Sequence, residues 1–389
     1  MLRILLLILI IGSHINMAIA SYSYELIEKD NHRIHVVTIN PSAFDISFVS
    51  AHDQVFGRAT VGEIAARRQG DIAINAGFFE IGGNDDGRPS GTLIIDGMIY
   101  GLMKPQHACL IKRNGQLSIE MIKPELTVEI GKWQISPSRF NRFIDTKGSY
   151  LYTSSWGPSS LSPYKNRKEI IIDSNYKVLS IASHGDNKIP EGGYLLSLPF
   201  DSDISGVTVG DTAKFNWHPE YLTERDTSVV LGTPALILNG RIQNELSDKD
   251  IHARTAVGIK ENGDLVIVIA EHVYSQSLKA VTLDEVNKII KAKQISIDDL
   301  TVRKLQQIVV DSLVTDNTTI GLTLEQLAKF MFEMGCVSAI NLDGGGSSTL
   351  YIDGKYVNHI TGDQDEGLGK KVERPVSNAI IFIKRDKNG

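Results

Sequence analysis

The chain has 389 residues, of which 42% are hydrophobic and 22% charged, and its formal net charge at pH 7 is −6. This length and composition are typical of one large or two ordinary globular domains that fold without needing disulfides. The slightly acidic balance, with no basic stripe, argues against nucleic acid or an anionic membrane as a partner.

The first twenty residues have the pattern of a secretory signal peptide. Arg3 supplies a positive charge, Ile4–Gly12 is an unbroken apolar run, and Ala18–Ala20 offers small residues for cleavage. An uncleaved membrane anchor is the alternative, but this run is shorter than the roughly 20 residues that a bilayer-spanning helix needs. We therefore expect an exported protein, periplasmic or secreted, that is cleaved after Ala20 and has no membrane span after cleavage.

Strand patterns dominate the first part of the remaining chain. Residues 22–50 alternate apolar and polar side chains, which predicts paired strands with a turn at Asn40–Pro41. A helix is expected at Val61–Gln69, and strands at Ile72–Ile74 and Thr92–Ile95. Cys109, further along, and Cys336 could pair in an oxidising compartment, but both lie in apolar stretches where two buried thiols are equally consistent. Hairpin turns are predicted at Asp96–Gly97, Asn114–Gly115, Asn239–Gly240, Asn262–Gly263 and Asp353–Gly354.

The middle and the end of the chain differ in pattern. Residues 125–220 are rich in Ser, Pro, Gly and Asp, with short strands such as Glu169–Ile172 and Tyr194–Leu198, and we interpret them as an inserted β-rich layer. Helical patterns follow at 282–305, and a last helix is expected at Thr323–Met334, where Thr323 and Gln326 form a capping box.

Together these elements predict an α+β fold. We expect a strand-dominated mixed sheet domain with a few packing helices, plus a β-rich N-terminal and inserted layer. The predicted organisation is an N-terminal β segment at 21–70 and a main domain at 71–389, with insertions at about 125–220 and 273–307.

Four segments combine glycines with polar side chains that packing alone would not require. The most informative begins with a predicted strand at 337–342, which ends at Asp343 and is followed by three glycines. Their bare N–H groups can bind an anion beside the carboxylate, and the hydroxyls of residues 347–349 can bind sugar or phosphate oxygens. The alternative is a glycine-rich turn that Asp343 merely caps. The other segments are residues 74–79 with 89–92, residues 254–258 and residues 373–379.

The spacing around these glycines excludes two common sites. The sequence GGGSS lacks the Gly-x-Ser-x-Gly order of a serine hydrolase nucleophile and the Lys-Ser/Thr end of a phosphate-binding P-loop. No Cys or His spacing is typical of zinc, so we expect no metal and no cofactor.

In order along the chain, five stretches resemble the landmarks of the phosphodiester glycosidase family. They are NAGFF, PSGTLI, RTAVG, GLTLEQLAKFMFEMGCVSAINLDGGGSSTLY and ERPVSNAIIFI. The likeness runs from about residue 70 to 385, is strongest after 320, and is highly specific in NLDGGGSST. Bacterial members of this family are often associated with exopolysaccharide synthesis.

The resemblance implies hydrolysis of the C–O bond of a sugar-1-phosphodiester, which releases free sugar and a phosphomonoester. The substrate would be a phosphate-linked glycoconjugate or polysaccharide, and the oligomeric state stays open. Asp343 is then the leading catalytic carboxylate. The predicted substrate- and phosphate-binding set is Asn75, Gly77, Arg254, Thr255, Gly344, Gly345, Gly346, Ser347, Ser348, Arg374 and Asn378.

Within this set the two arginines would pair with the phosphate, because a guanidinium offers two parallel donors. Asn75 and Asn378 would orient sugar hydroxyls. The alternatives are that Arg254 braces a carboxylate of the protein and that Arg374 pairs with Glu373 or another acid.

One departure from the family pattern concerns a second carboxylate. Relatives run from the RTAVG strand pair into an Asp-Gly-Arg segment, whereas here about forty extra residues intervene and Ser312 and Leu313 follow Asp311. Either Asp311 occupies the aspartate position, or Glu271 with His272 takes over. Both Asp311 and Glu271 are therefore candidate catalytic residues.

Two other functions remain as alternatives. A non-catalytic glycan-binding factor in envelope or exopolysaccharide handling would keep the glycines and arginines without needing a carboxylate. A metal-dependent phosphodiesterase would need clustered His and Asp ligands, but five histidines are scattered and do not pair at ligand spacing: His107, His184, His252, His272 and His359.

Overall fold

The computed structural model describes residues 21–144, 148–272, 319–360, 362–365 and 370–385, with five further residues between 287 and 301. The predicted signal peptide, the predicted catalytic residue Asp311 and nearly all of the predicted 273–307 insertion lie outside the described residues. None of the helices within these ranges is long and apolar enough to cross a membrane.

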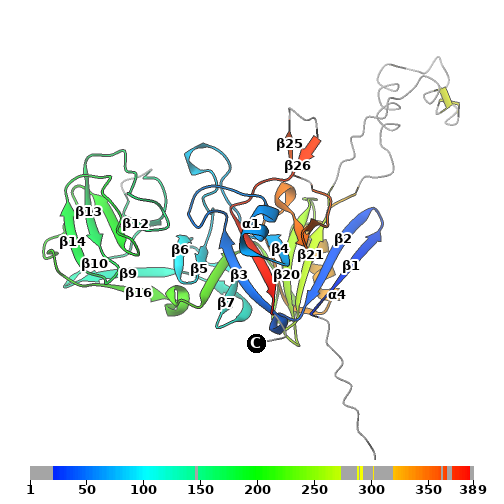
Figure 1. Cartoon of the computed structure of the whole chain (residues 1–389), viewed down its shortest axis with the longest axis horizontal. Helices are drawn as coiled ribbons and strands as arrows, with labels where there is room; N and C mark the ends of the chain where they lie inside the picture. Colours follow the sequence, from blue (N-terminus) through cyan, green and yellow to red (C-terminus); the bar gives the residue numbers. More distant parts are fainter. Residues whose placement is uncertain are drawn as a thin grey trace, which may run out of the picture.

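A seven-stranded antiparallel sheet forms one half of the main body (Figure 1). Its central strands read as continuous apolar runs because both of their faces are covered: every residue of β21 is buried, as are the first five of β20. In spatial order the strands are β1 (Tyr22–Lys29), β2 (His32–Ile39), β21 (Leu265–Ala270), β20 (Arg254–Lys260), β22 (Cys336–Asn341), β18 (Ala235–Leu238) and β19 (Arg241–Ile242).

A second, five-stranded antiparallel sheet packs face to face with the first. The core between them joins Val37, Ile267 and Ile340 of the first sheet to Ile74 and Ile380 of the second. In spatial order the second sheet contains β24 (Lys355–Tyr356), β23 (Leu350–Ile352), β4 (Ile72–Asn75), β27 (Asn378–Lys384) and β3 (Phe44–Ser50).

One helix covers the outer face of each main sheet. Helix α4 (Leu324–Glu333) packs through Leu327 and Met331 on the first sheet, and α1 (Val61–Arg68) packs through Ile64 on the second. Both begin with a capping box, in which Thr323 binds Gln326 and Thr60 binds Glu63. The result is a four-layer arrangement of helix, sheet, sheet and helix, which confirms the strand-dominated α+β prediction.

The remaining strands form further sheets. A third antiparallel sheet contains β6 (Met98–Gly101), β5 (Leu93–Ile95), β17 (Thr227–Leu231), β7 (His107–Arg113) and β8 (Gln116–Ile122). Strands β25 (Asp363–Asp365) and β26 (Lys370–Val372) form a two-stranded sheet.

Residues 125–218 form two sheets of their own, which Figure 1 shows extending to the left of the main body. The first contains β10 (Trp133–Ile135), β9 (Glu125–Ile130) and β16 (Ala213–His218). The second contains β11 (Arg139–Phe140), β12 (Tyr150–Thr153), β15 (Tyr194–Pro199), β13 (Arg167–Ile172) and β14 (Val178–Ala182).

The five predicted hairpin turns all join paired antiparallel strands. At four of them the Asp or Asn and the Gly that follows both have positive φ, as at Asp96 (46°) and Gly97 (78°). The prediction for residues 22–50 is only partly correct. Strand β1 pairs with β2 around Asp30–Asn31, but Pro41–Ala43 forms a 3₁₀ turn that carries the chain across to the other sheet.

Cys109 and Cys336 are free thiols, both buried in apolar surroundings on different sheets. Burial raises the pKa of the Cys336 thiol to about 11 and that of Cys109 well above its usual value. Of the two alternatives, the structure therefore has buried thiols.

Candidate functional site

The candidate site lies at one end of the sandwich, where strand ends of the first sheet meet strand ends of the second. In the first sheet, β20 and β22 are neighbours at this end, with Ala256 opposite Asn341. In the second sheet, Asn75 ends β4. The backbone N–H of Asp343 donates to the carbonyl of Ala76 across 2.9 Å, which joins the two sheets at this point.

Asn75 holds this junction together. Its buried side chain donates from Nδ2 to the Asp343 carbonyl at 2.6 Å, and its Oδ1 accepts from Thr349 N at 3.1 Å and from Thr255 Oγ1 at 2.9 Å. Thr255 Oγ1 also lies 3.3 Å from Ser348 Oγ. These contacts fix both ends of the glycine-containing loop, so the structure gives Asn75 and Thr255 a positioning role. Direct contact with a sugar stays a prediction.

Asn378, at the start of β27, makes a similar local clamp. Its Oδ1 accepts from Gly77 N at 2.6 Å, and its Nδ2 donates to Ser377 Oγ at 2.6 Å. A side chain at Gly77 would collide with Val230, since an added Cβ would lie 2.7 Å from Val230 Cγ2. Gly77 and Asn378 therefore shape the wall of the site through backbone packing.

The three glycines after Asp343 have different roles. Gly344 N donates to Asp343 Oδ1 at 3.0 Å, and Gly345 N donates to Ala253 O at 2.8 Å. Gly345 has a φ of 57°, and a Cβ at Gly344 would lie 2.7 Å from Ala253 O. Among the described residues only Gly346 N, of these three donors, has no acceptor. The predicted anion nest is thus reduced to one uncommitted N–H group.

Arg374 lies against this turn. A Cβ added at Gly346 would overlap its guanidinium. Arg374 Nε donates to Asp363 Oδ1 at 2.7 Å, while its terminal nitrogens have no acceptor within the described ranges. The predicted alternative was that Arg374 pairs with Glu373 or another acid. Glu373 instead accepts from Val61 N at 2.9 Å, and Asp363 is the acid that pairs with Arg374. Arg374 therefore keeps its two terminal nitrogens beside the turn, while Asp363 balances its charge through Nε.

The carboxyl group of Asp343 is poorly solvated. Burial raises its pKa from 3.8 to about 6, although the Ser347 hydroxyl, the Gly344 N–H group and the Arg374 charge all favour the ionised form. Ser347 Oγ is itself buried without a hydrogen-bond partner, so it lies near the carboxylate in a geometry short of a hydrogen bond. Perturbed carboxyl groups of this kind are common at functional sites.

Arg254 has a different environment from that of Arg374. Its Nε donates to Leu322 O at 2.9 Å and its Nη2 to Asp250 O at 2.5 Å. The side chain is nearly buried, and burial lowers the pKa of its guanidinium. Arg254 thus braces backbone carbonyls, not the carboxylate that the alternative reading supposed, and its predicted contact with phosphate is untested.

Glu271 follows β21 at the same end of the first sheet as Arg254, but it belongs to a separate cluster of hydrogen-bonded side chains. Its buried carboxylate is 2.7 Å from His35 Nε2 and 3.1 Å from His359 Nδ1. Burial acts to raise the pKa of Glu271, but the hydrogen bonds from His35 and His359 outweigh it, and the net shift is downward. His272, its predicted companion, instead accepts from Gly321 N through Nδ1 at 2.9 Å.

Sequence reasoning missed three residues near the site: His35, Asn358 and His359. Asn358 accepts from Leu350 N at 2.7 Å and donates to Ser348 O at 3.0 Å, which fixes the far side of the loop. His35 is one of many residues in an alternating strand, and the other two follow a hairpin. No local pattern marked them, because their partners are distant in the sequence.

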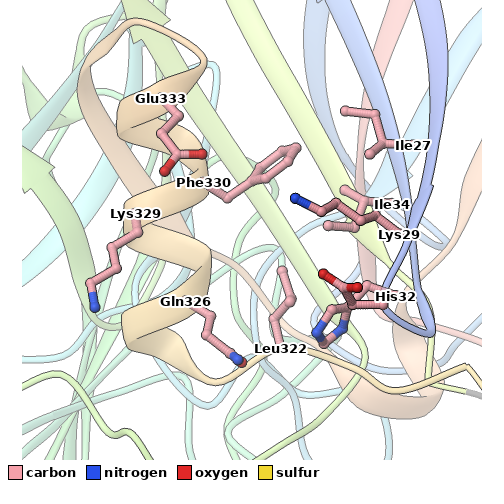
Figure 2. Close-up of a pocket in the computed structure, with 10 residues that line it drawn as sticks. Ile27, Lys29, His32, Ile34, Leu322, Gln326, Lys329, Phe330 and Glu333 are labelled. Carbon is pink, nitrogen blue, oxygen red and sulfur yellow. The ribbon is translucent and has the colours of Figure 1, made fainter.

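The structure also describes two cavities away from this junction. One, of about 380 Å³, lies between α4 and the β1–β2 hairpin, where Phe330 faces Ile27 and Ile34 (Figure 2). The other, of about 360 Å³, lies near Pro41 and Leu117. Neither is lined by a predicted site residue. Leu322 lines the first cavity, and its carbonyl is the one that holds Arg254.

Comparison with known sequences gives a consistent result. Residues 166–295 and 303–383, more than half of the chain, match the sequence profile of the family described as phosphodiester glycosidase. An uncharacterized protein of Rickettsia conorii is 36% identical over 282 residues, which cover 69% of this chain and 99% of that protein.

Solved structures share the fold at low sequence identity. A hypothetical protein from Synechocystis aligns with a TM-score of 0.67 and 20% identity, covering 94% of this chain and 62% of that one. A Burkholderia pseudomallei protein whose name includes the words "exported protein" aligns with a TM-score of 0.64 and 19% identity, covering 90% and 74%. The present chain thus spans less than two thirds of the Synechocystis protein.

Proposed function

Because this chain belongs to the phosphodiester glycosidase family, we propose that it hydrolyses the glycosidic C–O bond of a sugar-1-phosphodiester, releasing free sugar and a phosphomonoester. The single observation that carries the proposal is the corner at Asp343. There the poorly solvated carboxyl group of Asp343, with a raised pKa, lies near the Arg374 guanidinium and the uncommitted N–H group of the buried Gly346.

The proposed role of Asp343 follows from its environment. With a pKa of about 6, the group is mostly ionised at neutral pH, yet it is poorly solvated. Such a carboxylate interacts strongly with the positive charge that develops at the anomeric carbon of an oxocarbenium-like transition state. A phosphomonoester is a good leaving group, so the reaction needs little help from a general acid.

Arg374 and Gly346 are proposed to bind the phosphate. The terminal nitrogens of a guanidinium form two parallel hydrogen bonds with phosphate oxygens, and Asp363 fixes its orientation through Nε. The Gly346 N–H group adds a donor next to the guanidinium. Ser347 and Ser348 follow in the same loop, and Ser347 Oγ has no hydrogen-bond partner among the described residues.

The remaining predicted residues would act mainly by position. Asn75, Thr255, Gly77 and Asn378 hold the loop and the strand ends, and Arg254 braces the segment before α4. A catalytic role for Asp311 stays a prediction. The proposed substrate is a phosphate-linked glycoconjugate or polysaccharide, and the proposed location is outside the cytoplasm after signal cleavage.

Turnover of a small panel of glycosyl phosphodiesters tests this function. The methyl phosphodiesters of N-acetylglucosamine 1-phosphate, glucose 1-phosphate and mannose 1-phosphate would serve as probes. We expect wild-type turnover of at least one, a loss of 100-fold or more in D343N, and a fall in kcat/KM as the pH drops below about 6, where Asp343 becomes protonated. The exposed Asp201→Asn substitution is the matched control.

Two outcomes would reject the proposal: no turnover of any probe by the wild-type chain, or unchanged turnover in D343N. Binding without turnover would favour the glycan-binding alternative. Hydrolysis in oxygen-18 water separates the chemistries, because label in the sugar indicates C–O cleavage and label in the phosphate indicates P–O cleavage.

A further inference from the structure

A hydrogen-bonded chain surrounds Glu271 and ends at an exposed imidazole. Glu271 Oε1 is 2.7 Å from both His35 Nε2 and the backbone N of His359, and Oε2 is 3.1 Å from His359 Nδ1. Tyr24 Oη extends the chain at 2.9 Å from His35 Nδ1. The Glu271 side chain is fully buried, whereas that of His359 is 62% exposed.

Two contacts compete for Nδ1 of His359. An ionised carboxylate only accepts, so His35 Nε2 donates to Glu271, whichever way the Tyr24–His35 bond runs. At His359 Nδ1 the Arg33 guanidinium can only donate and Glu271 can only accept, and we take the shorter contact, to Glu271 at 3.1 Å against 3.2 Å to Arg33, as the one that Nδ1 makes. His359 then carries its proton on Nδ1 when neutral. Its Nε2, which has no partner among the described residues, is left as a proton acceptor.

Arg33 is the other charged group that faces this imidazole. Its Nη1 lies 3.2 Å from His359 Nδ1, and its Nε lies 4.0 Å from Glu271 Oε2 and 3.2 Å from Glu28. When Nδ1 donates to Glu271, the Arg33 guanidinium acts on this pair through its charge alone.

The strand register places this group close to the Asp343 corner. Ala270 pairs with Arg254, so the next positions in register are Glu271 and Ala253. The carbonyl of Ala253 accepts from Gly345 N. Ala253 therefore lies between Glu271 and the glycine turn. The backbones of Glu271 and the turn are thus about two strand spacings apart, at roughly 4.8 Å each.

A second connection runs through the segment that carries the imidazole. The Asn358 side chain donates to Ser348 O and to His359 O, each at 3.0 Å. The segment carrying His359 is thereby fixed to the loop that carries Ser347 and Ser348.

We propose that His359 is the general base of the reaction at the Asp343 corner and that Glu271 is its positioning residue. This inference rests on the proposed function. A water oxygen bonds to the anomeric carbon as the carbon–oxygen bond to phosphate breaks with its electron pair, and the phosphomonoester leaves. The water proton passes to His359 Nε2 and then to solvent, while the Asp343 carboxylate stays ionised and stabilises the sugar cation.

The experiment compares kcat, KM and the pH profile of wild type, H359Q, H359A, E271Q and D343N, with the methyl phosphodiester of N-acetylglucosamine 1-phosphate as the probe. We expect H359Q to lower kcat about 100-fold with KM changed less than threefold. Added imidazole should restore part of the activity of H359A. E271Q should lower kcat as well, because the carboxylate that orients the imidazole through Nδ1 is gone.

The exposed His184→Gln substitution is the matched control, since His184 contacts only the neighbouring Gly185 carbonyl and Asn187. Activity of H359Q within twofold of wild type, with D343N inactive, would overturn this inference alone. A loss that imidazole does not rescue and that leaves the pH profile unchanged would show a structural role and overturn it as well. A wild-type chain inactive on the whole panel would overturn the proposed function and this inference together.

Nitrogen-15 NMR of the wild-type imidazoles gives a readout that does not depend on turnover. Neutral His359 should carry its proton on Nδ1, and E271Q should shift the population toward the Nε2 tautomer. A wild-type His359 protonated mainly on Nε2 would contradict the assignment.

Discussion

The carboxyl group of Asp343 shows how this fold holds a poorly solvated charge. Asn75 and Ala76 fix the backbone on either side of it, while the side chain has one close backbone donor, Gly344 N. Desolvation therefore outweighs the favourable contacts, and the pKa rises to about 6. The ionised form that the proposed reaction needs is the form that this position disfavours.

Replacing Asp343 should stabilise the protein in a pH-dependent way. Because its folded-state pKa lies above the unfolded value of 3.8, the wild type loses stability as the pH rises from about 4 to 6 and stays lower above that range. D343N should raise the free energy of unfolding at pH 7 by up to roughly 3 kcal/mol, since each pKa unit corresponds to about 1.4 kcal/mol. Urea unfolding of both proteins from pH 4 to 8 measures the difference.

The gain should shrink toward pH 4 and vanish only at a pH well below 3.8, where Asp343 is protonated in both states. A gain of the same size at every pH would mean that relieved packing, not desolvation of the charge, explains it.

At the scale of elements, the start of α4 supports the site. Leu322, just before the N-cap Thr323, supplies the carbonyl that accepts from Arg254 Nε, and Thr323 Oγ1 accepts from Gln326 N at 3.1 Å. The cap thus fixes the residue on which Arg254 rests. The start of α4 and the position of the Arg254 guanidinium therefore depend on the same two residues, Leu322 and Thr323.

Substituting the cap should weaken the helix start and, with it, the backbone that accepts from Arg254. Thr323→Ala should cost about 1 kcal/mol of stability, as N-cap losses typically do. Urea denaturation measures this cost, and Thr208→Ala, at an exposed turn position, is the control. An unchanged denaturation midpoint in T323A would show that the cap contributes little here.

Elements with local signals could be predicted from the sequence. The Asp-Gly and Asn-Gly turns, and the Thr323–Gln326 box, are specified by residues a few positions apart. The crossing at Pro41 was missed because an alternating pattern does not say which sheet a strand joins.

The site could be predicted only in part. The Asp343 stretch was marked by its glycines and by resemblance, but Asn75 binds it from 268 positions away. His35 reaches Glu271 across 236 positions. The contact of Arg254 with an anion stays a prediction, and its hydrogen bonds to two backbone carbonyls are encoded by no residue pattern.

For the whole molecule, stability comes from the sandwich of two sheets and two helices, without a covalent cross-link in the described residues. The two cysteines are in different sheets, and both are buried. A chain of this size can bury enough apolar surface to fold unaided.

Reducing agent should therefore leave thermal unfolding unchanged. With and without dithiothreitol, the midpoints should agree within about 1 °C. Iodoacetamide should label neither Cys109 nor Cys336 in the native protein, since both are buried, and should label both in denaturant without reductant. Mass spectrometry counts the labels, and a protein that needs reductant for labelling would contradict the free thiols.

The single amide of Asn75 touches the backbone of Asp343 and Thr349, at the two ends of one loop, and the hydroxyl of Thr255 in β20. A substitution of Asn75 would remove the hydrogen bonds that hold Asp343, Thr349 and Thr255, and with them the junction between the two sheets. The Asp343 corner is therefore expected to lose its structure as a unit, instead of one group at a time.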